Sequence, residues 1–362
     1  MADRSQQTVF INGRFLTQGV TGVQRYARET LACMDEQVAR SSHSWVLLAP
    51  PGTPDPGLKH IVFQQVGTRS GHAWEQWDLY RHARQGLLFS FGFTGPILHS
   101  RQIITIHDGA VLRIPQAYTA KFRIWYSLLV SRLARKALRV VAVSQFSQSE
   151  AIACFGARAD RITVSTEGWQ HLERIQSDDR ILDAHQLRGR PFLLAVSSAS
   201  PNKNFAAIMA ALSLLGDAAP TCVIAGANNS TIFQQTDVKS EHLIRPGYVS
   251  DGELKALYQH AACFVFPSFY EGFGIPPLEA MSCGCPVLAS TAEAVTEVCG
   301  DAAIYFDPHD PEELAARIKT FFANPELRDR LINAGLQRAA QYSWAEAARI
   351  NIGVIENALK AR

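Results

Sequence analysis

The sequence predicts an α/β protein made of two Rossmann-like halves. Short, continuous apolar segments recur along the chain, and most of them alternate with stretches whose apolar residues follow helical spacing. This alternation is typical of parallel sheets, because consecutive parallel strands need a crossover connection, usually a helix. The alternation stops once, at a polar stretch over 170–190, and then starts again. We therefore predict two domains with a linker at 170–190, which a length of 362 residues accommodates.

Composition excludes several classes of protein. A hydrophobic content of 47% with 19% charged residues indicates a globular protein with an ample core. No apolar run reaches the ~20 residues of a membrane-spanning helix, and we expect no signal peptide. The seven cysteines are scattered, and Cys283 and Cys285 have no nearby partners at zinc spacing. We therefore expect reduced thiols and a cytoplasmic protein.

The first half is expected to form one parallel sheet, with helices that include 23–31 and 74–84. The predicted strands are 8–12, 45–49, 61–66, 87–91, 103–106, 139–144 and 162–166. The loop 13–22 joins the first strand to the first helix. Such a loop suits a phosphate, since the N–H groups and the dipole at a helix N-terminus favour an anion. The alternative is that Gly19 and Gly22 simply allow a turn.

The predicted strand 103–106 is followed directly by His107 and Asp108. In open α/β sheets, ligands bind outside the carboxyl ends of the strands. Both residues are therefore well placed to contact a ligand. The alternative is a structural histidine with satisfied hydrogen bonds, which is the usual role of a lone histidine.

Residues 109–149 contain no acidic residue but seven basic ones. These are Arg113, Lys121, Arg123, Arg132, Arg135, Lys136 and Arg139. Aromatic and aliphatic side chains, such as Trp125 and Leu128, lie between them. One interpretation is a helix within 113–139 that binds the inner face of the cytoplasmic membrane, because buried aromatic area and basic charge both favour an anionic lipid surface. The alternative is a solvated helix face. No nucleic-acid-binding motif is present.

The second half repeats the strand–helix pattern. Its predicted strands are 192–196, 221–225, 243–249, 263–266, 287–289 and 304–306, and its predicted helices include 292–298, 310–322, 325–342 and 344–360. Lys203 lies in the loop between its first strand and first helix. A lysine at this position would neutralise a diphosphate bound at the edge of the sheet.

The most informative stretch is FPSFYEGFGIPPLEAM, residues 266–281. Pro276 and Pro277 mark a helix start, so the preceding loop lies at a helix N-terminus, where an anion is favoured. Glu271 and Glu279 flank this site, and ionised carboxylates act purely as hydrogen-bond acceptors. An anion site next to acceptors for hydroxyl groups indicates a nucleotide sugar. The alternative is an ordinary tight turn between a strand and a helix.

The segment from Glu271 to Glu279, followed by Gly284-Cys285-Pro286-Val287, resembles the E-x7-E signature of the family 4 retaining glycosyltransferases, which have the GT-B fold. The resemblance implies two Rossmann-like domains facing a cleft. Residues 1–172 would bind the acceptor, and 190–343 would bind the donor. The C-terminal helix, within 344–362, would cross back to the first domain. The expected reaction is hexose transfer with retention of configuration, without a metal or other cofactor.

The resemblance also implies roles for individual residues. His107, Glu271 and Lys203 would be catalytic, and His107 and Asp108 would contact the acceptor. Glu271 would hold hydroxyls of the transferred sugar, although a nucleophile as in retaining glycosidases is the alternative. The residues expected at the donor are Gly22, Ser198, Lys203, Val249, Glu271, Gly272, Phe273, Gly274, Ile275 and Glu279. Ser198 and Asn202 depart from the family pattern, which has a glycine and a basic residue there.

The first half resembles bacterial mannosyl- and rhamnosyltransferases of polysaccharide and O-antigen assembly. GDP-mannose is therefore the first donor to consider, with a glycan or a lipid-linked glycan as acceptor. Two other functions remain open at this point. One is a different nucleotide-sugar enzyme, such as an epimerase, which would not transfer sugar to an acceptor. The other is a non-catalytic subunit that binds nucleotide sugars without turnover.

Overall fold

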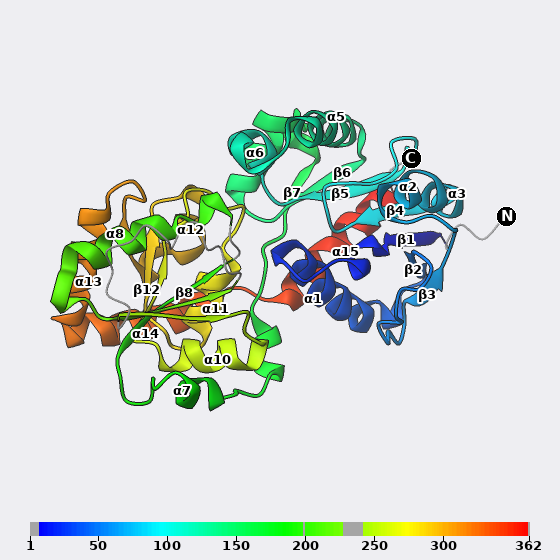
Figure 1. Ribbon diagram of the computed structural model, residues 1–362. Helices are drawn as coiled ribbons and strands as arrows, with labels where there is room; N and C mark the ends of the chain where they lie inside the picture. Colours follow the sequence, from blue (N-terminus) through cyan, green and yellow to red (C-terminus); the bar gives the residue numbers. More distant parts are fainter. Residues whose placement is uncertain (1–6, 198–199, 227–241, 361–362) are drawn as a thin grey trace. The chain divides into compact units, whose positions relative to one another are not determined.

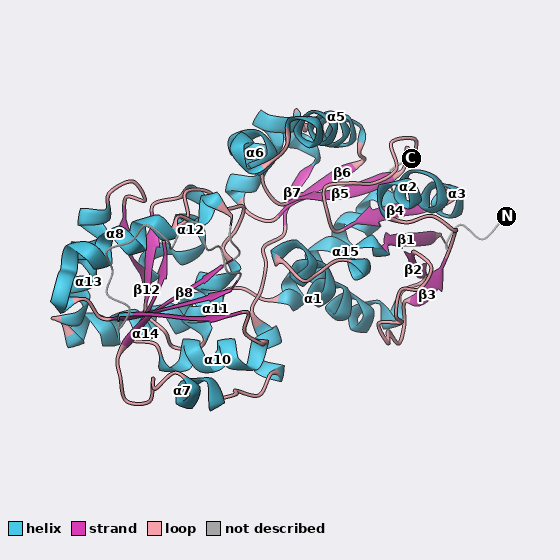
Figure 2. Ribbon diagram, in the orientation of Figure 1, coloured by secondary structure: helices cyan, strands magenta, loops and turns pink. Residues whose placement is uncertain are grey.

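The computed structural model of the protein describes residues 7–197, 200–226 and 242–360. The chain divides into two compact units (Figure 1). Unit 1 comprises Met1–Gly168 and Ser343–Arg362, and unit 2 comprises Trp169–Tyr342. Each unit consists of a central sheet with helices packed against it (Figure 2). The predicted α/β architecture with two Rossmann-like halves is confirmed.

The sheet of unit 1 has seven strands in the order β3-β2-β1-β4-β5-β6-β7, and all neighbouring strands are parallel. Every residue of β4 and β5 is buried, which explains their continuous apolar sequences. The strands are β1 (Thr8–Asn12), β2 (Ser44–Ala49), β3 (Val62–Gln65), β4 (Leu87–Ser90), β5 (Gln102–Ile106), β6 (Arg139–Ala142) and β7 (Ile162–Val164).

Most helices of unit 1 connect these strands, and the last one follows unit 2 in the chain. The helices are α1 (Gly22–Gln37), α2 (Gly71–Ala73), α3 (Tyr80–Ala83), α4 (Ala110–Arg113), α5 (Ala120–Lys136), α6 (Gln145–Phe155) and α15 (Trp344–Lys360). The regular helix predicted over 74–84 is interrupted, because Trp74–Leu79 forms a π-helical segment between α2 and α3. The last helix, α15, packs along α1, and the Asn351 side chain donates a hydrogen bond of 2.9 Å to the Tyr26 hydroxyl. The predicted return of the C-terminal helix to the first domain is confirmed.

The sheet of unit 2 has six strands in the order β10-β9-β8-β11-β12-β13, again with parallel neighbours. The strands are β8 (Phe192–Ser197), β9 (Thr221–Gly226), β10 (Leu243–Gly247), β11 (Cys263–Phe266), β12 (Val287–Ser290) and β13 (Ala303–Phe306). The helices are α7 (Arg180–Ala184), α8 (Phe205–Leu215), α10 (Asp251–His260), α11 (Ile275–Ser282), α12 (Glu293–Cys299), α13 (Pro311–Phe322) and α14 (Pro325–Ala339).

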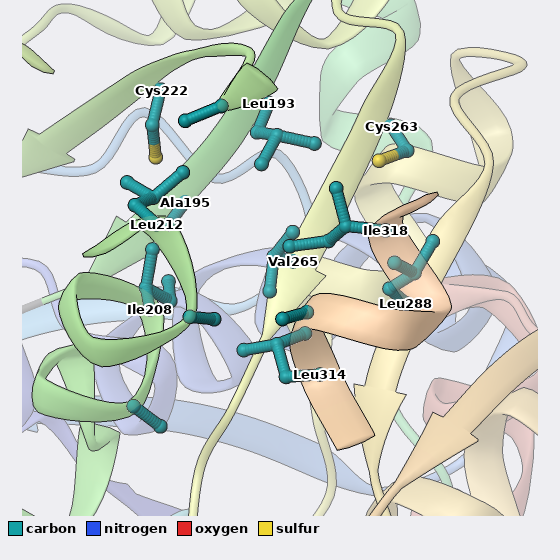
Figure 3. Packing of buried hydrophobic residues seen from close by; sticks show 14 of the residues in the cluster. Leu193, Ala195, Ile208, Leu212, Cys222, Cys263, Val265, Leu288, Leu314 and Ile318 are labelled. Atoms are coloured by element: carbon teal, nitrogen blue, oxygen red, sulfur yellow. The ribbon is translucent and has the colours of Figure 1, made fainter. Parts of the chain in front are cut away.

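The core of unit 2 lies between this sheet and the helices α8 and α13. Figure 3 shows Leu193, Val265 and Leu288, from three neighbouring strands, together with Ile208 of α8 and Ile318 of α13. Each of these side chains is at most 1% exposed. Burying a side chain of this size contributes about 1.5–3 kcal/mol. This packing holds β8 and β11 side by side, and the loops that follow these two strands form the site described below.

The stretch 170–190, which the sequence predicted as a linker, is instead part of unit 2. The Lys255 ammonium donates hydrogen bonds to the carbonyl oxygens of Leu172 (2.7 Å) and Ile175 (2.8 Å), and Leu182 is fully buried. The polar composition of the stretch concealed these anchoring contacts. The boundary between the units falls at Gly168 and Trp169. In the described part of the chain, none of the helices is both long and apolar enough to cross a membrane.

Candidate active site

The strand order of each sheet reverses direction at one pair of neighbours, β1 and β4 in unit 1 and β8 and β11 in unit 2. The loops after these strands run in opposite directions and leave a crevice at the carboxyl edge of the sheet, where open α/β proteins bind ligands. Most of the predicted site residues follow these strands or their neighbours, whereas Val249 follows the edge strand β10. Gly22, His107 and Asp108 belong to unit 1, and the remaining predicted residues belong to unit 2.

Lys203 and Glu271 meet at the reversal point of unit 2. The Lys203 ammonium lies 2.7 Å and 3.0 Å from the two carboxylate oxygens of Glu271. Their side chains are 19% and 13% exposed, so the pair is accessible from solvent at one side. The two residues are distant in sequence, and they meet because the loops after β8 and β11 lie next to each other. The Lys203 ammonium also lies 5.7 Å from the centre of the Phe266 ring.

Two asparagines tie these loops together. The Asn202 carbonyl accepts a hydrogen bond of 2.8 Å from the Phe269 backbone, and the Asn202 side chain donates one of 3.1 Å to the Tyr270 carbonyl. The Asn204 side chain donates to the carbonyls of Pro267 (3.1 Å) and Pro308 (2.7 Å). Asn202, which replaces a basic residue of the family pattern, therefore joins the two loops that carry Lys203 and Glu271.

Helix α11 begins immediately after this loop. Its N-cap is Gly274, with φ 121°, a conformation that favours glycine, and Gly274 offers no side chain to cap the first turn. Pro276 and Pro277 carry no N–H group, so the N–H donors at this helix end are those of Gly274 and Ile275. Together with the helix dipole they suit an anion. Phe273 and Ile275 are 4% and 8% exposed, so their side chains anchor the loop in the core. Gly272 lies between Phe273 and Glu271 in this loop.

Glu279 is buried on α11, with 6% of its surface exposed. One carboxylate oxygen lies 2.9 Å from Nε2 of His171, and the other accepts a hydrogen bond of 3.1 Å from the Tyr258 hydroxyl. Burial, together with the charge of Glu279, raises the pKa of Tyr258 well above its ordinary value. His171 and Tyr258 were not predicted from the sequence. His171 lies 108 residues from Glu279, inside the stretch that we predicted as a linker.

Two predicted donor residues are less informative in the structure. Val249 is half-buried between β10 and α10, at the carboxyl edge of the sheet. Ser198 lies outside the described residues. Gly22, in unit 1, is the first residue of α1, and its N-cap Thr21 donates a backbone hydrogen bond of 3.3 Å to the side chain of Gln24.

His107 is buried after β5, with 4% of its surface exposed. Its Nε2 lies 2.8 Å from the Phe91 carbonyl oxygen, and its Nδ1 lies 3.4 Å from a carboxylate oxygen of Glu167. Both ring nitrogens therefore face an acceptor of the protein. Tyr26 packs edge-on against the imidazole at a centroid distance of 5.1 Å. These contacts fix the ring.

Asp108 lines a pocket of about 390 Å³ at the reversal point of unit 1. This volume lies within the range of about 300–1,000 Å³ typical of small-ligand sites. Polar residues that line the pocket are Asn12, Arg14, Gln18, Thr21, Gln24, His72, Glu75, Thr94 and Asp108, and aromatic ones are Phe15, Phe91, Phe93, Tyr118, Phe122 and Tyr126. The Asp108 carboxylate also accepts a backbone hydrogen bond of 2.8 Å from Ala110.

The floor of this pocket is a buried ion pair between Glu75 and Arg14, which are 3.1 Å apart. Glu75 also accepts hydrogen bonds from Asn12 (2.9 Å) and Thr94 (3.0 Å) and contacts His72 (3.1 Å). Burial raises the pKa of Glu75, but these hydrogen bonds and the Arg14 charge outweigh burial and lower the pKa overall. The sequence analysis missed both members of this pair. Arg14 could have been found from its position just after β1, whereas Glu75 depends on the π-helical segment that carries it.

Comparison with known proteins agrees with this architecture. Residues 20–168 match the family described as "Glycosyltransferase Family 4", and residues 178–338 match "Glycosyl transferases group 1". The O-antigen chain mannosyltransferase B of Escherichia coli is 33% identical over 256 residues, which cover 67% of each chain. The O-antigen chain mannosyltransferase RfbU of Salmonella typhimurium is 26% identical, over 70% of each chain.

Among solved structures, HepE of Anabaena in complex with UDP and glucose superimposes with a TM-score of 0.74, at 17% identity, over 97% of this chain and all of that chain. The fold is therefore that of the GT-B glycosyltransferases. With a relative at 33% identity, the chain belongs to the family 4 glycosyltransferases, as its E-x7-E segment predicted. The protein is a glycosyltransferase.

Proposed function

We propose that this glycosyltransferase moves mannose from GDP-mannose to a glycan or lipid-linked glycan of the bacterial surface, with retention of anomeric configuration. The observation that carries the proposal is the Lys203–Glu271 pair at the N-terminus of α11, on the reversal point of the unit 2 sheet. It combines a cation, a polarised helix end and a carboxylate. The similarity to O-antigen mannosyltransferases of Escherichia coli and Salmonella typhimurium supports mannose as the transferred sugar.

In this proposal unit 2 binds the donor. The backbone of Gly272, Phe273, Gly274 and Ile275 approaches the diphosphate. Lys203 and the N–H groups of Gly274 and Ile275 stabilise the negative charge that grows on the leaving diphosphate in the transition state. Glu271 accepts hydrogen bonds from hydroxyls of the transferred sugar. Both of its oxygens contact Lys203, which suits an acceptor held in place better than a nucleophile.

The nucleoside part of the donor is assigned to the neighbouring residues. Glu279 accepts hydrogen bonds from the ribose hydroxyls, and His171 and Tyr258 hold its carboxylate in position. The backbone near Val249 contacts the base. Ser198 is kept as a predicted contact of the diphosphate on the basis of the family pattern alone.

Unit 1 binds the acceptor in this proposal. Asp108 contacts an acceptor hydroxyl at the pocket, and His107, fixed by Phe91 and Glu167, positions the groups that react. Gly22, at the start of α1, allows the donor diphosphate or the acceptor to approach the backbone. We propose that no metal takes part.

We also propose that the enzyme works in the cytoplasm at the inner face of the cytoplasmic membrane. Helix α5 exposes Ile124 (60%), Trp125 (41%) and Leu128 (69%) next to basic residues such as Lys121 and Arg132. Exposed apolar side chains among basic ones favour binding to an anionic lipid surface. Such a location would bring the enzyme to a lipid-linked acceptor.

The test is a calorimetric titration with GDP, UDP, ADP and dTDP in the absence of metal, followed by incubation with GDP-mannose and a mannose-terminated glycan. We expect preference for GDP and an α-linked product by NMR. Binding of GDP with an isomerised sugar nucleotide as the product would favour an epimerase. Binding without turnover of any nucleotide sugar would favour a non-catalytic subunit. Preference for another nucleotide would overturn GDP-mannose as donor.

A further inference from the structure

The charged residues that line the pocket of unit 1 indicate which kind of acceptor the pocket binds. We propose that it takes an uncharged pyranose at the end of the acceptor glycan, and that the rings of Tyr118, Phe122 and Tyr126 support the adjoining sugars. This inference rests on the proposed function, because it specifies the acceptor of that reaction. It also makes a claim about the pocket alone, which can be tested without any donor.

The charges around the pocket disfavour an anionic ligand. Among the described residues that line it, Arg14 is the only lysine or arginine. Its guanidinium is already paired with Glu75 at 3.1 Å, and its side chain is 16% exposed. Asp108 adds a further carboxylate at the wall. His72 also lines the pocket, 3.1 Å from a carboxylate oxygen of Glu75. With a neutral imidazole, a phosphate or carboxylate on the ligand would meet two carboxylates and one guanidinium, so a sugar without such a group fits better.

The same residues suit hydroxyl groups. Arg14 donates to Glu75 and, at 2.9 Å, to Thr94, and it has further N–H groups for which the described residues supply no partner. Asp108 offers carboxylate oxygens at the same pocket, whereas the Asn12 amide is already bonded to Glu75 and Ser90 and the Gln24 amide to Gln18. A ring of sugar hydroxyls can both donate to and accept from such a set.

An aromatic row leads from the surface into this pocket. Tyr118 and Phe122 stack with centroids 5.8 Å apart and an interplanar angle of 18°, and Phe122 and Tyr126 stack at 5.0 Å and 22°. Phe93 continues the row at 5.9 Å from Tyr126, and it lies 5.5 Å from His107. The row therefore connects half-exposed rings at the pocket mouth to the predicted catalytic histidine.

The geometry of the row matches an extended saccharide. Residues spaced by four on a helix lie on one face, so the rings of Phe122 and Tyr126 on α5 present one nearly continuous apolar wall. A pyranose has an apolar C–H face and a polar rim, and can therefore lie against this wall while its hydroxyls reach the floor. Ile124 and Leu128, on the same helix, do not line the pocket. The Trp125 ring lies 6.2 Å from Phe122 and 4.6 Å from His72, so the surface proposed for lipid borders the sugar-binding row.

The experiment is a ligand-observed NMR titration of the full chain, without donor, with methyl α-mannoside, α-linked mannotriose and mannose 6-phosphate. We expect mannotriose to bind more tightly than the monosaccharide, and mannose 6-phosphate at least about tenfold more weakly than methyl α-mannoside. Phe122→Ala and Tyr118→Ala should weaken mannotriose binding by about 3- to 10-fold each, the strength of one aromatic contact. Both side chains are more than a third exposed, so these variants should keep the wild-type melting temperature.

The matched control is Leu98→Ala, which removes a 64% exposed apolar side chain of unit 1 outside the pocket. It should leave all three affinities unchanged. Glu75→Gln keeps the side-chain volume but leaves Arg14 without its counter-charge. It should reduce the ratio between the affinities for methyl α-mannoside and mannose 6-phosphate. This change in selectivity is not expected if Glu75 only supports the fold.

Three outcomes would overturn the inference. Equal or tighter binding of mannose 6-phosphate by the wild type would refute the uncharged acceptor. Unchanged mannotriose binding in both aromatic variants would refute the stacking row. Loss of binding to anionic lipid vesicles in Phe122→Ala, with mannotriose binding intact, would assign the row to the membrane surface. Failure to bind any nucleoside diphosphate would instead refute the proposed function and leave the saccharide titrations interpretable.

Discussion

Replacing Lys203 by methionine tests the centre of the proposed donor site. The substitution keeps most of the side-chain volume and removes the ammonium that lies 2.7 Å from Glu271. Two consequences for the donor follow. The diphosphate loses a charge-assisted hydrogen bond, and the Glu271 carboxylate, only 13% exposed, is left as an unneutralised negative charge beside the phosphate site.

The expected magnitude follows from these two terms. A hydrogen bond to a charged group contributes about 1.5–3 kcal/mol, which corresponds to a loss of about 10- to 150-fold in GDP affinity. If Lys203 also stabilises charge that develops in the transition state, kcat should fall by a further factor of about 10² or more. The double variant Lys203→Met/Glu271→Gln removes both charges, and should therefore bind GDP more tightly than Lys203→Met alone.

The assay is calorimetric titration with GDP together with steady-state kinetics using GDP-mannose. Lys319→Met, an exposed lysine of α13 in the same unit, is the matched control and should behave as the wild type. Unchanged GDP affinity in Lys203→Met would remove Lys203 from the site. A double variant that binds GDP more weakly than Lys203→Met would show that Glu271 does not repel the diphosphate.

Three other predictions concern the surroundings of the site. His171→Ala should raise KM for the donor about tenfold with little change in kcat, because Glu279 would bind ribose equally in the ground and transition states. His171→Gln should recover part of the loss. A fall in kcat alone would contradict this role. The pKa of Glu75 is lowered in the folded state, so its ionised form stabilises the fold above the ordinary pKa of 4.5. The difference in unfolding free energy between wild type and Glu75→Gln should therefore shrink as pH falls through the folded-state pKa. Urea titrations between pH 7 and pH 3.5 would measure it, and a constant difference would contradict it. Treatment with EDTA should leave transfer from GDP-mannose intact, whereas a strict requirement for added magnesium would refute a metal-free mechanism.

Much of the fold could be predicted because its central strands, such as β4, β5, β11 and β12, are buried on both faces. The predicted strand 263–266 coincides with β11, since a short apolar run that ends at a proline has few other interpretations. Lys203 and Glu271 could be placed in strand-to-helix loops for the same reason. Their contact depends on the strand order, which brings β8 next to β11. This order cannot be read from the residues alone, although the resemblance to the family 4 glycosyltransferases implies it.

The missed features depend on contacts between distant residues. Nothing local to His171 indicates that it will meet Glu279, and the polar residues around it favoured a linker. The Arg14–Glu75 pair requires both the crossing of two loops and the π-helical segment Trp74–Leu79. A π turn adds a residue to the helical repeat, which apolar spacing alone does not reveal. The roles of the individual site residues remain predictions that the variants above will test.

The assignment of α15 to unit 1 has a consequence for biosynthesis. Unit 2 is one uninterrupted segment, whereas unit 1 needs residues from both sides of it. On the ribosome, unit 2 can therefore complete its fold before the helix that covers Tyr26 has been translated. Until then, the nascent first unit exposes the apolar face of α1, which makes it more prone to aggregation than the completed unit.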